Sequence, residues 1–95
     1  MAWSTKTVTL NKNSNNGNPI QLPIAVANKG IQLKANKDNS DTIWIAPNQA
    51  TFNGSDDFPL DATDTILMDV GNMSELWIRT TSPSDVRLHL LIMNK

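Results

Sequence analysis

The sequence has no cysteine, no tyrosine and no long hydrophobic run. Without cysteine the chain can form no disulfide bond, thiolate metal site or thiol nucleophile. Its longest apolar stretches, such as residues 88–93, fall far short of the ~20 residues that a membrane-spanning helix needs. Eight Lys and Arg residues are scattered among nine Asp and Glu, so the formal net charge is −1 and no basic face is available for phosphate groups. The composition therefore argues against a membrane span and against nucleic acid as a partner.

The length of 95 residues allows one compact domain. A domain of this size buries only roughly 60–65% of the surface that its unfolded chain exposes, so it is marginally stable alone. We therefore expect it to associate with partners, including further copies of itself. The first residues, Met-Ala-Trp-Ser-Thr-Lys, lack the basic segment and apolar core of a secretory signal. From this we expect a soluble intracellular protein.

Apolar residues recur at every second position along most of the chain, and helical spacing is nearly absent. Because the side chains of a strand alternate between its two faces, this period predicts half-buried strands. The connections are too short for helical crossovers, which favours antiparallel pairing. About seven or eight short strands with turns every ~8–12 residues are typical of an all-β fold, and we predict an antiparallel β-sandwich. The expected strands are residues 5–10, 20–27, 31–36, 43–46, 65–70, 75–79 and 86–93, with a short apolar contact at 58–60.

Residues 11–19, Asn-Lys-Asn-Ser-Asn-Asn-Gly-Asn-Pro, form a low-complexity segment. Such a polar run cannot bury enough apolar surface to order itself. It predicts an N-terminal strand and Asn-rich linker, residues 1–18, followed by a single β-sandwich domain, residues 19–95. A tethered strand can add to an exposed sheet edge of its own chain or of another chain. Three residues are candidate guards of the sheet edges against aggregation: Pro23, Lys34 and Arg87.

The residues that carry chemistry are few and isolated. The lone histidine, His89, has no second histidine or cysteine to complete a metal site, so we interpret it as structural. Segments 38–41 and 56–57 offer the oxygen ligands that calcium needs, but neither has the EF-hand pattern, and turns or solvated loops are expected there. The one glutamate, Glu75, lies at the start of an expected strand and predicts a surface role. With no nucleophile elbow and no glycine-rich phosphate loop, we expect a protein that is not an enzyme and has no cofactor or metal.

Trp44 and Trp77 occupy matching places in two similar segments, Thr-Ile-Trp-Ile-Ala and Glu-Leu-Trp-Ile-Arg. In both, the tryptophan lies on the face opposite two aliphatic residues. If the aliphatic residues face the core, both indoles point outward, where tryptophan anchors protein interfaces or stacks on sugar rings. Alternatively, the two tryptophans pack on each other as a cross-strand pair half covered by a loop. These alternatives remain open from the sequence.

Five segments follow one another in a recognisable order over roughly residues 18–80. They are Pro19-Ile20-Gln21-Leu22-Pro23-Ile24-Ala25-Val26-Ala27-Asn28, Lys34-Ala35-Asn36-Lys37-Asp38-Asn39, Thr42-Ile43-Trp44-Ile45, Phe58-Pro59-Leu60 and Glu75-Leu76-Trp77-Ile78. In order, these are a Pro-Leu-Pro-like strand, an Ala-rich polar turn, an Ile-aromatic-Ile strand, a Gly-Phe-x-Leu-type loop and an aromatic strand near the end. This order resembles small structural proteins of tailed bacteriophages. The resemblance implies a virion protein with a jelly-roll-like sandwich and no catalytic residues to transfer.

Our leading hypothesis is a capsid-associated decoration or cement protein, or a head-fibre or neck component. We expect it at the capsid surface or neck of the virion, and in the host cytoplasm during assembly. Its expected partners are a major capsid or other virion protein and further copies of itself. The N-terminal strand would reach a neighbour by strand addition, and a tryptophan would anchor the body. A carbohydrate-binding or receptor-binding module of a phage fibre is the alternative, and a host adaptor domain is a third. The candidate partner-binding residues are Trp3, Val8, Leu10, Trp44 and Trp77.

Overall fold

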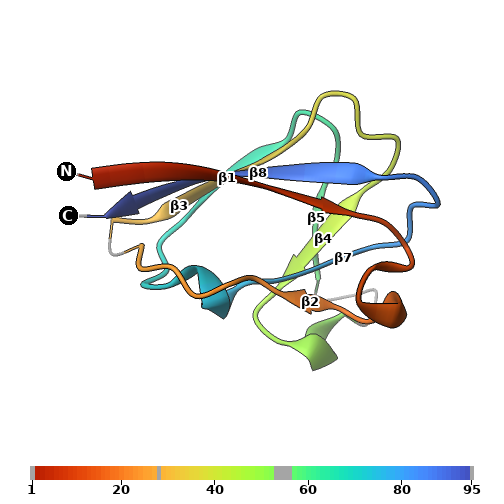
Figure 1. Ribbon diagram of the computed structural model, residues 1–95, viewed down its shortest axis with the longest axis horizontal. Helices are drawn as coiled ribbons and strands as arrows, with labels where there is room; N and C mark the ends of the chain where they lie inside the picture. The colour runs from red at the N-terminus through yellow and green to blue at the C-terminus, as the bar shows by residue number, and fades with distance from the viewer. Residues whose placement is uncertain (1, 28, 53–56, 95) are drawn as a thin grey trace.

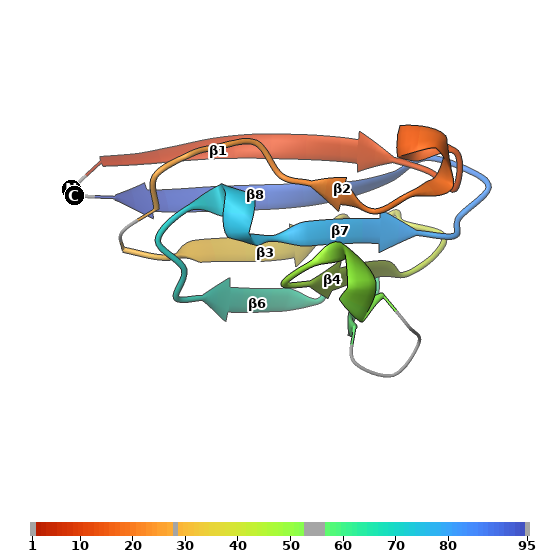
Figure 2. The same ribbon diagram turned by 90° about the horizontal axis from the view of Figure 1, so that it is seen from below.

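The chain folds into two antiparallel four-stranded β-sheets that form two layers (Figure 1). The computed structural model describes residues 2–27, 29–52 and 57–94. Within them, sheet A has the strand order β1-β8-β3-β6, which Figure 2 shows, and sheet B has the order β2-β7-β4-β5. These eight strands confirm the all-β antiparallel sandwich predicted from the sequence. The strands are β1 (Ala2–Leu10), β2 (Ile20–Gln21), β3 (Ile31–Ala35), β4 (Ile43–Ala46), β5 (Phe58–Leu60), β6 (Thr65–Met68), β7 (Trp77–Thr80) and β8 (Val86–Asn94), and the 3₁₀ turns are η1 (Ser14–Gly17), η2 (Gln49–Thr51) and η3 (Met73–Glu75).

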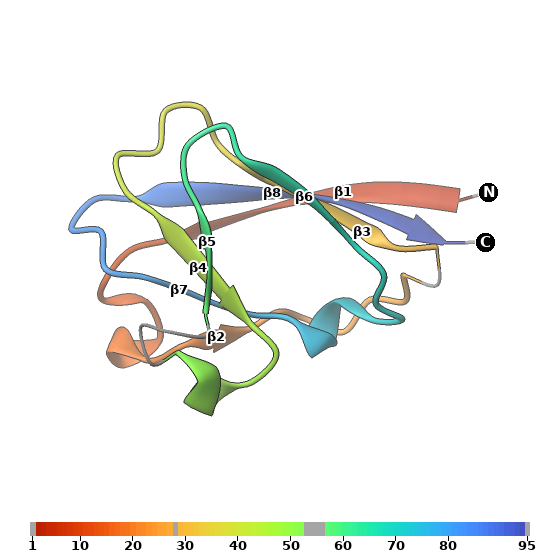
Figure 3. The same ribbon diagram turned by 180° about the vertical axis from the view of Figure 1, so that it is seen from behind.

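The strand pairs are nested along the chain. β1 pairs with β8, β2 with β7, β3 with β6 and β4 with β5, so the second half of the chain runs back along the first. Two further ladders, β3–β8 and β4–β7, join these pairs into the two sheets. Figure 3 shows the layers from behind, with the two chain ends side by side at one end of sheet A.

The core lies between the sheets and is built from one parity of each strand. In β3, Gln32 and Lys34 alternate with buried residues, and in β4 Trp44 lies between two buried isoleucines. Fully burying each large aliphatic side chain contributes about 1.5–3 kcal/mol. The hydrophobic cluster consists of Leu10, Leu22, Ala27, Ile31, Leu33, Ala35, Ile43, Ile45, Leu60, Met73, Leu76, Ile78, Val86, Leu88, Leu90 and Ile92.

The sequence predicted a strand over residues 20–27, but β2 covers only Ile20–Gln21 and ends two residues before Pro23. Proline has no N–H to donate to a ladder. The residues that follow bond instead to the turn at residues 71–73. Alternation placed Ile24 and Val26 on the buried face, but the structure corrects this, because they are 83% and 56% exposed.

β1 belongs to sheet A of its own chain. It pairs with β8 over its full length, from Ala2 opposite Asn94 to Leu10 opposite Val86. The sequence left open whether this strand pairs with a sheet of its own chain or of another chain. In the structure it pairs within its own chain. β1 is therefore a full strand of the sandwich.

The Asn-rich segment connects β1 to β2 through local hydrogen bonds. The Asn11 backbone N–H donates to Ser14 Oγ (2.9 Å), and Asn15 Nδ2 donates to the carbonyl of Pro19 (2.8 Å). Asn15 and Asn16 both have positive φ, at 53° and 56°. Asparagine tolerates this left-handed conformation better than most residues, so the composition suits an ordered turn.

Hydroxyl groups organise the turn between β7 and β8. Thr80 Oγ1 donates to the carbonyl of Thr42 (2.8 Å) and accepts from the backbone N–H of Ser82 (3.2 Å). Ser82 is fully buried, and its Oγ donates to the carbonyl of Ser84 (2.7 Å). These bonds satisfy polar groups that would otherwise be buried without partners.

The edge strands are β1 and β6 in sheet A and β2 and β5 in sheet B. Of the candidate edge guards, Pro23 follows the edge strand β2, whereas Lys34 and Arg87 lie on the inner strands β3 and β8. The structure therefore corrects the assignment of the two basic residues.

No helix among the described residues is long and apolar enough to cross a membrane.

Candidate interaction surfaces

The outer face of sheet B carries Trp44, Trp77 and Arg79. The register places Trp44 directly opposite Arg79, and Trp77 two residues before it on the same face. This follows from strand alternation, because the neighbouring residues Ile45 and Ile78 point into the core. The three side chains thus form one cluster on two adjacent strands, which we call the Trp–Arg face.

Both tryptophans of the Trp–Arg face are half-buried. Trp44 and Trp77 are diagonal neighbours, and residues in this relation are about 7–8 Å apart, within reach of aromatic side chains. Ala46, which is opposite Trp77 on this outer face, is only 4% exposed. The outward orientation predicted from the sequence is therefore present, together with partial cover.

The Trp–Arg face combines flat apolar surface with a cation and an amide. Arg79 is directly opposite Trp44 and two residues after Trp77, and its guanidinium offers several N–H donors. Gln21, opposite Trp77, donates from Nε2 to the carbonyl of Ser74 (2.9 Å). Tryptophan and arginine are the residues enriched at the energetic centres of protein interfaces, and indoles also stack on sugar rings.

The outer face of sheet A carries a second apolar group. Trp3 lies opposite Met93, and Leu91 lies in one row with Gln32 and Leu67 across β8, β3 and β6. Trp3 is 67% and Leu67 69% exposed. β8 therefore has apolar residues on both faces: Leu88, Leu90 and Ile92 lie in the core, and Leu91 and Met93 lie on this outer surface.

Two of the predicted partner-binding residues are not on any outer surface. Leu10 is 1% exposed and belongs to the core, and Val8 packs against the core. The even-numbered residues Val8 and Leu10 of β1 face the core, so their side chains stabilise the fold. Leu10 is thus buried and Val8 partly buried on the core side of β1, whereas Trp3, Trp44 and Trp77 lie on outer faces.

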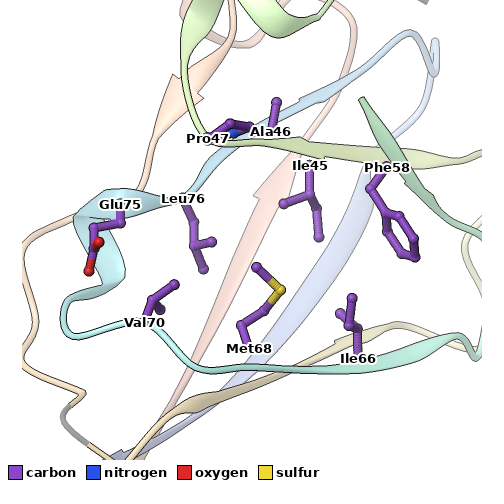
Figure 4. Close-up of a pocket in the computed structure, with 9 residues that line it drawn as sticks. All are labelled: Ile45, Ala46, Pro47, Phe58, Ile66, Met68, Val70, Glu75 and Leu76. Atoms are coloured by element: carbon purple, nitrogen blue, oxygen red, sulfur yellow. The ribbon is translucent and has the colours of Figure 1, made fainter. Parts of the chain in front are cut away.

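An apolar pocket of about 420 Å³ opens between the two sheets on the side of β5 and β6. Figure 4 shows Ile66, Met68 and Val70 facing Ile45 and Leu76 across it, with Phe58 at one end. β5 has only three residues, so it covers little of this side of the sandwich. The pocket can accept an apolar side chain of a partner. Its remaining lining residues are Ala46, Pro47 and Glu75.

His89 and Glu75 have structural partners in this fold. Thr7 Oγ1 and His89 Nδ1 are hydrogen-bonded across the outer face of sheet A at 3.0 Å. Glu75 Oε2 accepts from the backbone N–H of Asn72 (2.9 Å) as part of a capping box at η3. His89 thus has the structural role that the sequence favoured. Glu75 is on the surface, as expected, and also caps η3.

The two segments considered for calcium, residues 38–41 and 56–57, are described to different extents by the structure. In segment 38–41, Asp41 Oδ1 accepts from the Thr42 backbone N–H (2.8 Å), which is turn geometry. In segment 56–57, Asp56 lies outside the described residues, and Asp57 Oδ1 is buried without a hydrogen-bond partner. In the described part of the chain, no three His, Asp or Glu side chains come together as a metal site would require.

Comparisons of the chain with models of protein families, with curated proteins and with solved structures found no match. Neither Arg79 nor Leu67 was among the candidate binding residues predicted from the sequence. Strand parity nevertheless places Arg79 on the face of Trp77, and Leu67 on the face away from the inward Ile66. The geometry of the two outer faces therefore carries the functional argument.

Proposed function

We propose that the chain is a non-enzymatic structural protein of a tailed-bacteriophage virion, a capsid-associated decoration or cement protein that binds and stabilises the head shell. The observation that carries the proposal is the Trp–Arg face, in which Trp44, Trp77 and Arg79 share one outer sheet surface. A protein that clamps an assembled shell needs a rigid docking surface with aromatic and arginine anchors. The partner would be a major capsid or other virion protein.

The fold supports the same proposal. Pairing of β1 with β8, β2 with β7, β3 with β6 and β4 with β5 is the arrangement expected when one long antiparallel hairpin wraps into two sheets. We propose that this nested order is that of a jelly roll, a double-sheet architecture that is frequent in viral capsid domains. Fold alone does not assign function, and the Trp–Arg face is therefore the stronger support for the proposal.

A head-binding experiment tests the proposal. The probe is purified heads of the phage whose genome encodes the chain, prepared without this protein, and the readout is co-sedimentation. Binding of many copies per head is expected. Failure of the folded wild-type chain to bind, together with its absence from mass spectra of complete virions, would overturn the proposal.

A matched pair of charge reversals locates the contact. Arg79→Glu places a carboxylate in the Trp–Arg face, and we expect at least about tenfold weaker head binding, because interface arginines at such centres contribute about 2 kcal/mol. Arg87→Glu makes the same charge change on the outer face of sheet A, and we expect binding to be kept. Equal effects of the two substitutions would remove the Trp–Arg face from the proposal.

A carbohydrate- or receptor-binding module of a phage fibre is the second candidate. Half-buried Trp44 and Trp77, with Arg79 and Gln21 as hydrogen-bond donors, also suit sugar stacking. A glycan array combined with intrinsic tryptophan fluorescence separates the candidates. The cement proposal predicts no sugar-dependent quenching, and saturable quenching that is lost in Trp77→Leu would favour the fibre module.

A further inference from the structure

β1 is much longer than the other three edge strands, which are short or have a proline in or near them. β2 has two residues and is followed by Pro23, β5 has three residues including Pro59, and β6 has four residues. Short length and proline are the usual means by which proteins prevent pairing at sheet edges. β1 has nine residues and no proline.

The outer edge of β1 presents a row of unpaired backbone groups. On β8, Met93 donates to Gly30 and Arg87 accepts from Asn36, each at 3.0 Å, so the odd residues of β8 bond toward β3. In an antiparallel ladder the even residues then bond toward β1. The register pairs them with the even residues of β1. The N–H and C=O groups of Trp3, Thr5, Thr7 and Thr9 therefore point away from the sheet, and the described residues provide no partner for them.

We propose that this edge pairs with β1 of a second copy of the chain, antiparallel across a two-fold axis, to give one continuous eight-stranded sheet. A second copy fits because the free groups occur at every second residue, so odd residues meet odd residues in a two-fold pair. Two-fold pairing is also the commonest symmetry of homo-oligomers. The small net charge of −1 does not oppose it. This inference goes beyond the proposed function and does not depend on it.

Side chains select the register. The axis can pass through Thr5, Lys6 or Thr7 and still join odd residues. At Lys6 the two ammonium groups would face each other, which is unfavourable. At Thr7, Trp3 would extend past the end of the partner's β1. At Thr5, Trp3 lies opposite Thr7 of the second copy and Lys6 opposite Ser4, so the 67% exposed indole gains a neighbour.

The association is expected to be weak, because one edge-to-edge strand pair buries less than the about 1,200 Å² of small specific interfaces. Sedimentation velocity from about 10 μM to about 1 mM should show a monomer that converts to a dimer. A monomer at every concentration overturns the proposal.

Amide hydrogen exchange of the wild-type chain gives a residue-level test. The amides of Lys6 and Val8 should be protected at all concentrations, because they bond to β8. Those of Thr5 and Thr7 should exchange at least about tenfold more slowly at high than at low concentration. Concentration-independent exchange at these two amides would show that β1 is not the interface.

Substitutions at Thr5 distinguish an effect on pairing at the β1 edge from an effect on folding. Thr5→Pro removes an N–H that β8 does not use, so the chain should stay folded and monomeric, whereas Thr5→Val keeps the N–H and should dimerise. Dimerisation of the proline variant equal to that of wild type contradicts the proposal.

The absence of native cysteine allows a cross-linking test of the register. Thr5→Cys places two thiols in directly opposed positions, where Cα atoms are about 5.5 Å apart, so an oxidant should give a disulfide-linked dimer. In Thr9→Cys the thiols lie roughly 27 Å apart at ~3.4 Å per residue, and cross-linking should be much slower. Equal rates overturn the Thr5-centred pairing.

Discussion

The side-chain amide of Asn39 pairs with the backbone of Arg87 much as a neighbouring strand would. Asn39 Oδ1 accepts the Arg87 N–H at 2.8 Å, and Asn39 Nδ2 donates to the Arg87 carbonyl at 2.9 Å. β3 ends at Ala35, so one side chain extends the ladder on β8 beyond the last residue of β3. This bond pair ties the turn at residues 36–39 to sheet A.

Replacing Asn39 with alanine should therefore destabilise the protein. Both bonds are exposed, so water replaces them in part, and we expect a loss of about 1 kcal/mol in the free energy of unfolding. Urea denaturation measures the loss. Lys37→Ala, an exposed position in the same turn, is the control and should have almost no effect. Equal midpoints for the two variants would show that the bond pair adds no stability.

Thr80→Val tests the buried hydroxyl at the turn between β7 and β8. The valine has a similar shape but leaves the N–H of Ser82 and the carbonyl of Thr42 without their partner. We expect a cost of about 1–3 kcal/mol, measured by thermal or urea unfolding. Thr81→Val is the matched control, because Thr81 is exposed. A Thr80→Val protein as stable as wild type would contradict the assigned bonds.

Leu10→Ala tests whether β1 is part of the core. Its side chain is 1% exposed, and truncation of such a leucine costs about 2–5 kcal/mol. Thr9→Ala, on the exposed outer face, should cost far less. Deletion of residues 1–18 should remove cooperative unfolding, because β8 loses its partner along nine residues. A truncated chain with an intact, cooperative transition would restore the interpretation of residues 1–18 as a separate arm.

Asn72→Ala tests the turn that connects β6 to β7. Asn72 Oδ1 accepts from the backbone N–H groups of Ala25 and Ser74, each at 3.0 Å. Loss of this cap should cost about 2 kcal/mol and loosen the segment that follows Pro23. Asn72→Asp keeps the acceptor and should recover most of the stability in the same denaturation assay. Equal losses in the two variants would mean that Oδ1 is not the important atom.

Strand positions were predictable from the sequence because alternation is a local property. The residues that alternate in β3, β4, β7 and β8 have the predicted parity, and Trp44 and Trp77 point outward as that parity requires. The failures arise from long-range partners. Asn72 captures the backbone at Ala25 from 47 residues away, and no local pattern shows that this bond replaces a strand.

The candidate surfaces were predictable only in part, for the same reason. Parity placed Trp77 on an outer face, but only the register with β4 brings Arg79 opposite Trp44. Likewise, parity makes Leu10 inward-facing, but its burial depends on which sheet β1 joins. The sequence left that choice open, and pairing with β8 makes Leu10 a core residue.

The nested strand order has a consequence for folding during synthesis. Leu10 pairs with Val86 and Ala2 with Asn94, so β1 cannot form its ladder until β8 has been made. Pairing across most of the chain is slow, because a long loop must close before any contact stabilises it. Until the ribosome releases β8, β1 is an unpaired, threonine-rich strand, and crowded nascent chains can capture one another at this segment.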